Sequence, residues 1–228
     1  MAGIGAVTRS TLRQQIADAL RDEVLAGRLQ PGQEFTVKEI AEQYGVSATP
    51  VREALVDLSA QGLLDAVQHR GFEVHAYSLS DYRAMIEARG LITDGLFRRL
   101  IDAEGKAVGE APRHSLALGP IRRRGEEAAR AATAGDLNIL IGYDLRFWRE
   151  VSALVGNPYL ADFLHRLRVR SWVCAVQHLR GSTGLGDRLW SGHPRLVDAL
   201  VHHDPVAAHA VVTDYHAHSL GLLGQPAE

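Results

Sequence analysis

The stretch TVKEIAEQYGVSATPVREAL, residues 36–55, predicts two short helices joined by a tight turn. Thr36 and Glu39 have the spacing of a capping box, in which the Thr hydroxyl accepts a first-turn amide and the Glu carboxylate accepts the cap amide. Gly45 ends the first helix, because glycine adopts the left-handed conformation without steric cost. The pattern therefore places one short helix between Thr36 and Gly45.

A second helix is predicted directly after this turn. Ser47 and Thr49 can each cap it, and Pro50 is tolerated in its first turn, where backbone amides lack partners within the helix. Two strands then follow, at residues 63–67 and 72–75, joined by a turn that contains a glycine. Two helices joined in this way, with a hairpin after them, are typical of a winged helix-turn-helix that reads the major groove of DNA.

Upstream, Thr11 and Gln14 have the spacing of another capping box, which predicts a helix that begins near Thr11 and ends at Gly27. Residues 29–32 form a turn before the helix-turn-helix. The first domain is therefore expected to cover residues 1–77, as a winged helix-turn-helix with a two-strand wing.

Seven residues of this domain are candidates for contact with DNA. Arg52 lies near the start of the second helix, where its guanidinium can reach a phosphate or a guanine edge, and Thr49 can donate to a phosphate. The wing turn supplies further donors. The predicted DNA-binding set is Lys38, Ser47, Thr49, Arg52, His69, Arg70 and Gly71.

The charge balance constrains how such a domain would bind. The chain carries a net charge of −2, and residues 1–78 carry 7 basic against 10 acidic side chains, a net −3. A DNA-binding protein with this balance must gather its positive groups on one face, and its binding is expected to be strongly salt-dependent. A symmetric dimer would double the contacts.

The composition also indicates the compartment and excludes some kinds of site. The single cysteine, Cys174, excludes an internal disulfide and a metal site built on paired thiolates. We find neither a signal peptide nor an apolar run long enough to span a membrane, and the protein is expected to be cytoplasmic.

After residue 78 the hydrophobic spacing is helical to the end of the chain. Helices are expected at about residues 80–103, 120–134, 136–155, 157–179, 189–203 and 205–222. Residues 104–119 are expected to form a loop or a weak helix. The fold class is therefore mainly α, with an all-α bundle of about six helices at residues 78–228.

Four polar side chains lie within the apolar stripes of these helices. They are Arg89, Asp144, His193 and His216. Each alone has an ordinary structural explanation, but burying a polar group is costly without a partner. Four such groups on four helices predict a polar pocket in the core of the bundle.

The run AGRLQPGQEFTVKEIAEQYGVSATPVREALVDLSAQGLL, residues 26–64, with the RGFEV of the wing, resembles the winged-helix domain of GntR-type bacterial transcription regulators. The resemblance implies DNA binding by the second helix. One position departs from the family pattern, because Ala48 stands where these regulators usually carry an Arg after the Ser of GVS. The operator sequence is therefore not expected to copy that of relatives.

The second domain resembles the FCD-type ligand-binding domain of the FadR branch of that family. The resemblance rests on three stretches of sequence, AGDLNILIGYDLRFW, NPYL and HPRLVDALVHHDPVAAHAVV. The resemblance implies that an Asp, a His four residues later and two further His hold a divalent metal, and that this metal organises a carboxylate effector. An Asp and a His one helical turn apart lie on one face, as a metal requires.

This chain keeps only part of that set. Position 148 is Trp, and Tyr215 stands where the last His is expected, with His216 beside it. A divalent metal such as zinc is not required, and the residues left to hold one are Asp144, His193 and His216. Alternatively the pocket recognises its effector directly, with Arg89 pairing with a carboxylate and Trp148 filling the place of the missing His. The candidate effector residues are Arg89, Asp144, Trp148, His193 and His216.

The sequence thus predicts a homodimeric, effector-responsive transcription regulator, expected to be a repressor, that binds a palindromic DNA operator and senses a small organic acid. One alternative is an architectural DNA-binding protein whose helical domain serves only dimerisation. Another is a metal-dependent hydrolase, but the chain has no HExxH, nucleophile elbow or phosphate loop. No enzymatic activity and no membrane partner are expected.

Overall fold

The structure is a computed structural model that describes residues 4–104, 115–179 and 182–223. The chain forms two compact units. The first comprises Met1–Ser78 with Trp172–Arg180, and the second comprises Leu79–Ser171 with Gly181–Glu228. None of the described helices is both long enough and apolar enough to cross a membrane.

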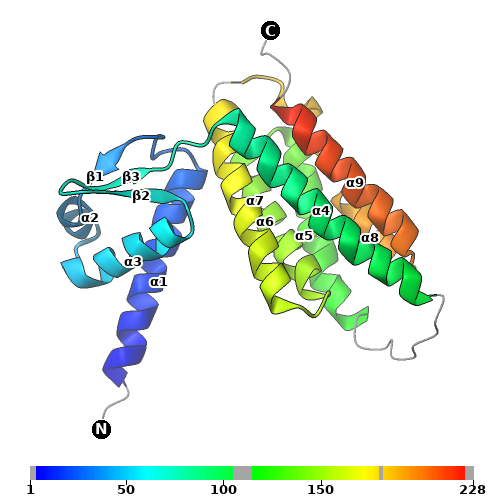
Figure 1. Ribbon diagram of the computed structural model, residues 1–228, viewed down its shortest axis with the longest axis horizontal. Coiled ribbons are helices and arrows are strands. Elements are labelled where there is room, and N and C mark those ends of the chain that lie inside the picture. The colour runs from blue at the N-terminus through cyan, green and yellow to red at the C-terminus, as the bar shows by residue number, and fades with distance from the viewer. Residues whose placement is uncertain (1–3, 105–114, 180–181, 224–228) are drawn as a thin grey trace. The chain divides into compact units, whose positions relative to one another are not determined.

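The N-terminal unit is a winged helix-turn-helix (Figure 1). Its elements are α1 (Ile4–Leu25), β1 (Glu34–Phe35), α2 (Val37–Tyr44), α3 (Ala48–Ala60), β2 (Leu64–Val67) and β3 (Gly71–Val74). The strands form an antiparallel sheet in the order β1-β3-β2, with Leu64 opposite Val74 and Phe35 opposite Phe72. The core of this unit is fully buried, with Leu20 from α1 and Leu55 and Leu58 from α3 at 2% exposure or less.

The residues predicted to begin and end α2 are confirmed. Thr36 is its N-cap, and both bonds of the capping box are present: Glu39 N donates to the Thr36 hydroxyl, and Thr36 N donates to Glu39 Oε2 at 2.7 Å. Gly45 ends the helix in the left-handed conformation, with φ at 63°. The two strands of the wing are also found.

Two details of this unit differ from the prediction. The sheet has a third strand, β1, whose two residues pair with β3 and which no local pattern indicated. Helix α1 begins at Ile4, so Thr11 lies inside it and does not open it. A capping motif satisfies amides only where the chain enters a helix, and here the chain has entered earlier.

The second unit is a bundle of helices. They are α4 (Leu79–Glu104), α5 (Ser115–Ala134), α6 (Leu137–Ala153), α7 (Pro158–Leu179), α8 (His193–Val201) and α9 (Pro205–Leu222), with a short 3₁₀ turn, η1 (Leu185–Asp187). The part of α7 from Trp172 onward belongs to the first unit. Helix α5 packs against α6 and α8, and α9 packs against α4 and α8. Figure 1 shows α4 and α9 side by side along their length.

The six helices expected in the described part of this unit are confirmed, with one change. Helix α5 begins at Ser115, inside the stretch predicted as a loop or weak helix, and continues through Pro120. A proline removes one backbone donor from a helix, so α5 continues with one hydrogen bond fewer. Most of the predicted loop, residues 105–114, lies outside the described residues.

Candidate functional sites

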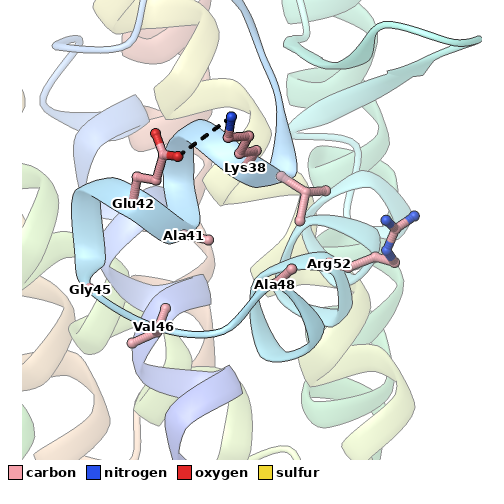
Figure 2. Close-up of a pocket in the computed structure, with 8 residues that line it drawn as sticks. Lys38, Ala41, Glu42, Gly45, Val46, Ala48 and Arg52 are labelled. Atoms are coloured by element: carbon pink, nitrogen blue, oxygen red, sulfur yellow. Dashed lines mark ion pairs between the residues drawn. The ribbon is translucent and has the colours of Figure 1, made fainter.

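The turn between α2 and α3 borders an open hollow of about 430 Å³ on the surface of the N-terminal unit. Figure 2 shows Lys38 and Glu42 of α2 on one side of it and Ala48 and Arg52 of α3 on the other. Lys38 forms an exposed ion pair with Glu42 at 3.8 Å. Arg52 is exposed and forms no ion pair with any residue that the structure describes. Its guanidinium is therefore available to a phosphate or a base edge.

The start of α3 is suited to phosphate binding. Ser47 is the N-cap residue, with an extended backbone, but its side chain makes no capping hydrogen bond. Ser47 and Thr49 are both exposed. The hydroxyls and the first amides of α3 are thus left for an outside acceptor, and the N-terminal end of a helix favours an anion.

The wing places two exposed basic groups at its tip. The Nη1 atom of Arg70 lies 3.5 Å from Oε1 of Glu34 in β1, and both side chains are largely exposed. His69 is exposed and has a positive φ of 63°. Gly71 has φ 124°, and a Cβ at this position would lie 2.5 Å from the Phe35 carbonyl oxygen. The close approach of β1 therefore accounts for the glycine at position 71, whether or not it touches DNA.

In the helical unit, Asp144, Trp148 and His193 form one hydrogen-bonded group. Asp144 is 1% exposed and its Oδ1 accepts from Trp148 Nε1 at 3.0 Å and from His193 Nε2 at 2.8 Å. Trp148 reaches it because the two residues lie one turn apart on α6. The rings of Phe147 and Trp190 contact the His193 ring edge-on, with centroids 5.0 and 4.7 Å away. The group is held in one orientation by these contacts.

Two arginines are buried beside this group. Arg89 of α4 is 1% exposed, and its Nη1 donates to the Ser171 hydroxyl at 3.3 Å. Arg168 of α7 is also 1% exposed, and its guanidinium lies 4.5 Å from the centroid of the Trp148 ring. Its Nη1 is 3.5 Å from the Ser152 hydroxyl, a long contact. Arg89 was predicted from the sequence, whereas Arg168 was missed.

Several nitrogen atoms of this core have no hydrogen-bond partner among the residues that the structure describes. Arg89 Nε and Nη2, Arg168 Nε, His193 Nδ1 and His216 Nε2 are buried and unpaired. Buried polar groups in proteins are nearly always satisfied, and the exceptions call for a bound ion, water or ligand. Three of the five atoms are N–H donors on guanidinium groups, so any group that pairs with them must accept hydrogen bonds.

The pKa values of neighbouring groups are shifted by burial and by the positive charges of the two buried arginines. Burial, and then the charge of Arg89, lowers the pKa of Arg168 to about 10, so its guanidinium stays charged at neutral pH. Burial, followed by the charges of Arg89 and Arg168, lowers the pKa of His216 to about 3. Burial also raises the pKa of Tyr215, so its hydroxyl stays protonated. His216 is therefore a neutral ring in a positively charged core.

The metal set expected from the sequence is not assembled. Among the described side chains, no group of three His, Cys, Asp or Glu could hold a metal ion. Asp144 and His193 lie together, but the Asp144 oxygen that His193 approaches also accepts from Trp148. The pKa of His216 is lowered by burial and by the charges of Arg89 and Arg168, and these guanidinium charges would also repel a cation. The residues present therefore do not fit the metal implied by the family resemblance.

The comparisons with known proteins agree with both units. Residues 12–74 match the family described as "Bacterial regulatory proteins, gntR family". Residues 84–218, more than half of the chain, match the FCD domain. The chain belongs to the GntR family, with an FCD domain.

Relatives of this GntR protein are transcription regulators. A "Probable D-xylose utilization operon transcriptional repressor" of Paenarthrobacter nicotinovorans is 29% identical over 209 residues, which cover 92% of this chain and 87% of that protein. The "HTH-type transcriptional regulator McbR" of Escherichia coli K12 is 27% identical over 172 residues, covering 75% of this chain and 73% of that protein. The GntR protein described here is accordingly a transcription regulator and not an enzyme.

The fold of this GntR protein is also known from solved structures. The E. coli McbR/YncC structure superimposes with a TM-score of 0.72 at 22% identity, covering 94% of this chain and 97% of that chain. At this identity the likeness concerns the fold alone. The winged helix followed by a helical FCD domain is thus shared, while the residues of the core are those of this chain.

Proposed function

We propose that this GntR regulator is a cytoplasmic homodimeric repressor that binds a palindromic operator and responds to a small organic acid bound in its helical domain. The proposed domains are residues 1–77 for DNA binding and 78–228 for effector binding and dimerisation. Binding of the acid would shift the population between two dimer geometries, which changes the spacing of the two α3 helices on the operator.

DNA binding is proposed to rest on the start of α3 and on the wing. Arg52 offers an unpaired guanidinium, and Ser47 and Thr49 offer exposed hydroxyls beside the first amides of α3. Lys38, His69 and Arg70 add positive or donor groups on the same unit. The sequence of this unit carries a net −3, so one protomer alone offers few phosphate contacts, and a dimer on two half-sites doubles them.

The observation that carries the effector proposal is the free edge of Arg89. Its Nε and Nη2 atoms are both buried and have no partner among the described residues, while Nη1 donates to the Ser171 hydroxyl. The N–H groups of Nε and Nη2 are parallel, and this edge of a guanidinium accepts the two oxygens of one carboxylate in a bidentate pair. An organic acid is the class of effector that satisfies this edge.

The DNA-binding part is tested by fluorescence anisotropy on DNA from upstream of the protein's own gene, at several salt concentrations. We expect salt-sensitive binding, and we expect Arg52→Ala to weaken it and to reduce the salt slope by about 1 per protomer. Arg83→Ala is the matched control, since Arg83 is an exposed arginine of α4 and its loss removes the same charge. Wild-type protein without salt-sensitive binding would contradict the proposal.

The effector part is tested by adding organic acids to the protein–operator complex. We expect at least one organic acid to lower the affinity for the operator and Arg89→Gln to remove this response while leaving binding in the absence of the acid. Operator binding that no acid alters would favour the architectural reading, in which the helical domain serves dimerisation only.

A further inference from the structure

We infer that Arg89 and Arg168 together clamp a single carboxylate, and that the effector is a monoanion bound without a metal ion. The inference rests on the proposal that the helical domain senses an organic acid, and it names the second anchor and the charge of that acid. Arg168 has no role in the sequence-based prediction. Its placement, burial and unpaired atom in the structure assign it this one.

Helix α7 brings the two guanidinium groups together. Arg168 and Ser171 lie one turn apart on α7, and the Ser171 hydroxyl is the group to which Arg89 of α4 donates. Tyr215 of α9 lies between them, with its ring 5.2 Å from the Arg89 guanidinium and stacked at 4.7 Å on Trp148, which Arg168 covers. Each arginine also shifts the titration of His216. Arg89 and Arg168 therefore act on the same small volume.

The charges of this volume do not balance. Among the described residues of the helical unit, the fully buried ionised side chains are Arg89 and Arg168 against Asp144. His216 is neutral. One positive charge remains, and a monoanion neutralises it.

The unpaired donors have the right chemistry for a carboxylate. Arg89 offers Nε and Nη2, and Arg168 offers Nε, so three buried N–H groups lack an acceptor among the described residues, and a carboxylate has two oxygens with four lone pairs. His216 Nε2 is a fourth buried atom without a partner among the described residues. The rings of Trp148 and Tyr215 form apolar walls next to these donors. A dicarboxylate would bring a second negative charge that no described buried group offsets, and a divalent cation would meet two positive charges.

The test uses the full-length protein, treated with EDTA and dialysed, and its melting temperature in sodium acetate as the probe. Sodium chloride keeps the ionic strength constant, and acetamide is the uncharged analogue. At about ten times its dissociation constant, acetate is expected to raise the melting temperature by about 3–5 °C. Acetamide is expected to have no effect, and malonate a smaller effect than acetate at equal concentration.

Variants assign the effect to the two arginines. Arg168→Gln and Arg89→Gln are expected to abolish the acetate shift, and Arg168→Lys, which keeps the charge, to retain part of it. Without acetate, Arg168→Gln is expected to melt no lower than wild type, because it removes an unbalanced buried charge. Arg166→Gln is the control, since Arg166 lies on the same helix but is exposed and pairs with Asp162. It keeps the shift.

Each other outcome overturns the inference. An acetate shift that survives in Arg168→Gln removes Arg168 from the site, and a larger effect of malonate contradicts a monoanion. An acetate shift that appears only after zinc is added to the EDTA-treated protein contradicts binding without metal, and no shift with acetate at 100 mM contradicts the clamp. Operator binding by the same preparations separates the two proposals. An acetate shift that leaves operator affinity unchanged supports the clamp and contradicts the effector-responsive regulator.

Discussion

Asp144 and Trp148 lie one turn apart on α6, and the indole Nε1 donates to Asp144 Oδ1 at 3.0 Å in a fully buried position. The same oxygen accepts from His193 Nε2. Asp144 is the carboxylate that offsets part of the charge of Arg89 and Arg168. The stability of the helical unit is therefore expected to depend on it.

Asp144→Ala is expected to lower the free energy of unfolding by about 3–5 kcal/mol, because it removes the negative partner of buried positive charges. The variant leaves Trp148 Nε1 and His193 Nε2 without their acceptor and raises the unbalanced positive charge of the core. Urea unfolding followed by circular dichroism measures the change. Asp162→Ala, at the exposed partner of Arg166, is the control and is expected to change stability by less than about 1 kcal/mol. Equal effects of the two substitutions would show that Asp144 is not a partner of buried charges.

His216 predicts a particular dependence of stability on pH. Its pKa is lowered to about 3 in the folded protein, from the usual 6.5. Between pH 6.5 and pH 3 the unfolded chain binds a proton that the folded chain does not, so this group removes stability as the pH falls through that window and has no effect above it. The loss approaches about 1.4 kcal/mol per pH unit.

His216→Gln is expected to flatten the pH dependence between pH 4 and pH 6.5, measured as the difference in unfolding free energy from wild type. His202→Gln, at an exposed histidine, is the comparison and is expected to leave the slope as it is. If the His216 variant and wild type lose stability in parallel as the solution is acidified, the histidine is not buried in its neutral form.

Gly71→Ala is expected to destabilise the winged helix by more than about 2 kcal/mol, because its Cβ would meet the Phe35 carbonyl oxygen at 2.5 Å and φ is 124°. Gly32→Ala is the matched control, since Gly32 also has a positive φ but open space around its Cβ. That substitution is expected to cost only about 1–2 kcal/mol, the price of the left-handed backbone. Thermal unfolding of both variants checks this, and equal losses would mean that the contact with β1 relaxes freely.

Ala48→Arg tests the position at which this chain departs from the GntR pattern. Ala48 is exposed on the rim of the hollow shown in Figure 2, so an Arg side chain there has room to reach DNA. We expect tighter binding to non-operator DNA and a salt slope steeper by about 1 per protomer, measured by anisotropy. Ala60→Arg is the control, since Ala60 lies at the opposite end of α3, is exposed, and the substitution adds the same charge. The same steepening in both variants would show a general effect of charge and no contact at position 48.

The sequence predicted the fold well where the signals are local. Thr36, Glu39 and Gly45 determine the bounds of α2 through hydrogen bonds and a backbone conformation that neighbouring residues supply. The two-residue strand β1 could not be predicted in this way, because Glu34 and Phe35 become a strand only through pairing with β3. Likewise, a capping motif at Thr11 does not show whether the chain upstream is already helical.

The candidate site was predicted in part. Asp144 and His193 were found because each interrupts an apolar stripe, and the structure joins them at 2.8 Å. Arg168 was missed because Arg166, Arg168 and Arg170 alternate along α7, which hides the one that faces inward. Its neighbours Leu164 and Ser171, both buried and lying four and three residues away on the helix, are the signal that could have identified it.

The placement of Arg168 over Trp148 also makes the core spectroscopically observable. Trp148 stacks with Trp190 at 6.3 Å, and each indole donates to a carboxylate, Asp144 and Asp214 respectively. The emission and near-ultraviolet circular dichroism of an indole respond to charges close to its ring and to coupling with a neighbouring indole. An anion that draws the Arg168 guanidinium off the Trp148 face would therefore change the optical spectrum of the unlabelled protein, which gives a direct signal for titrating candidate effectors.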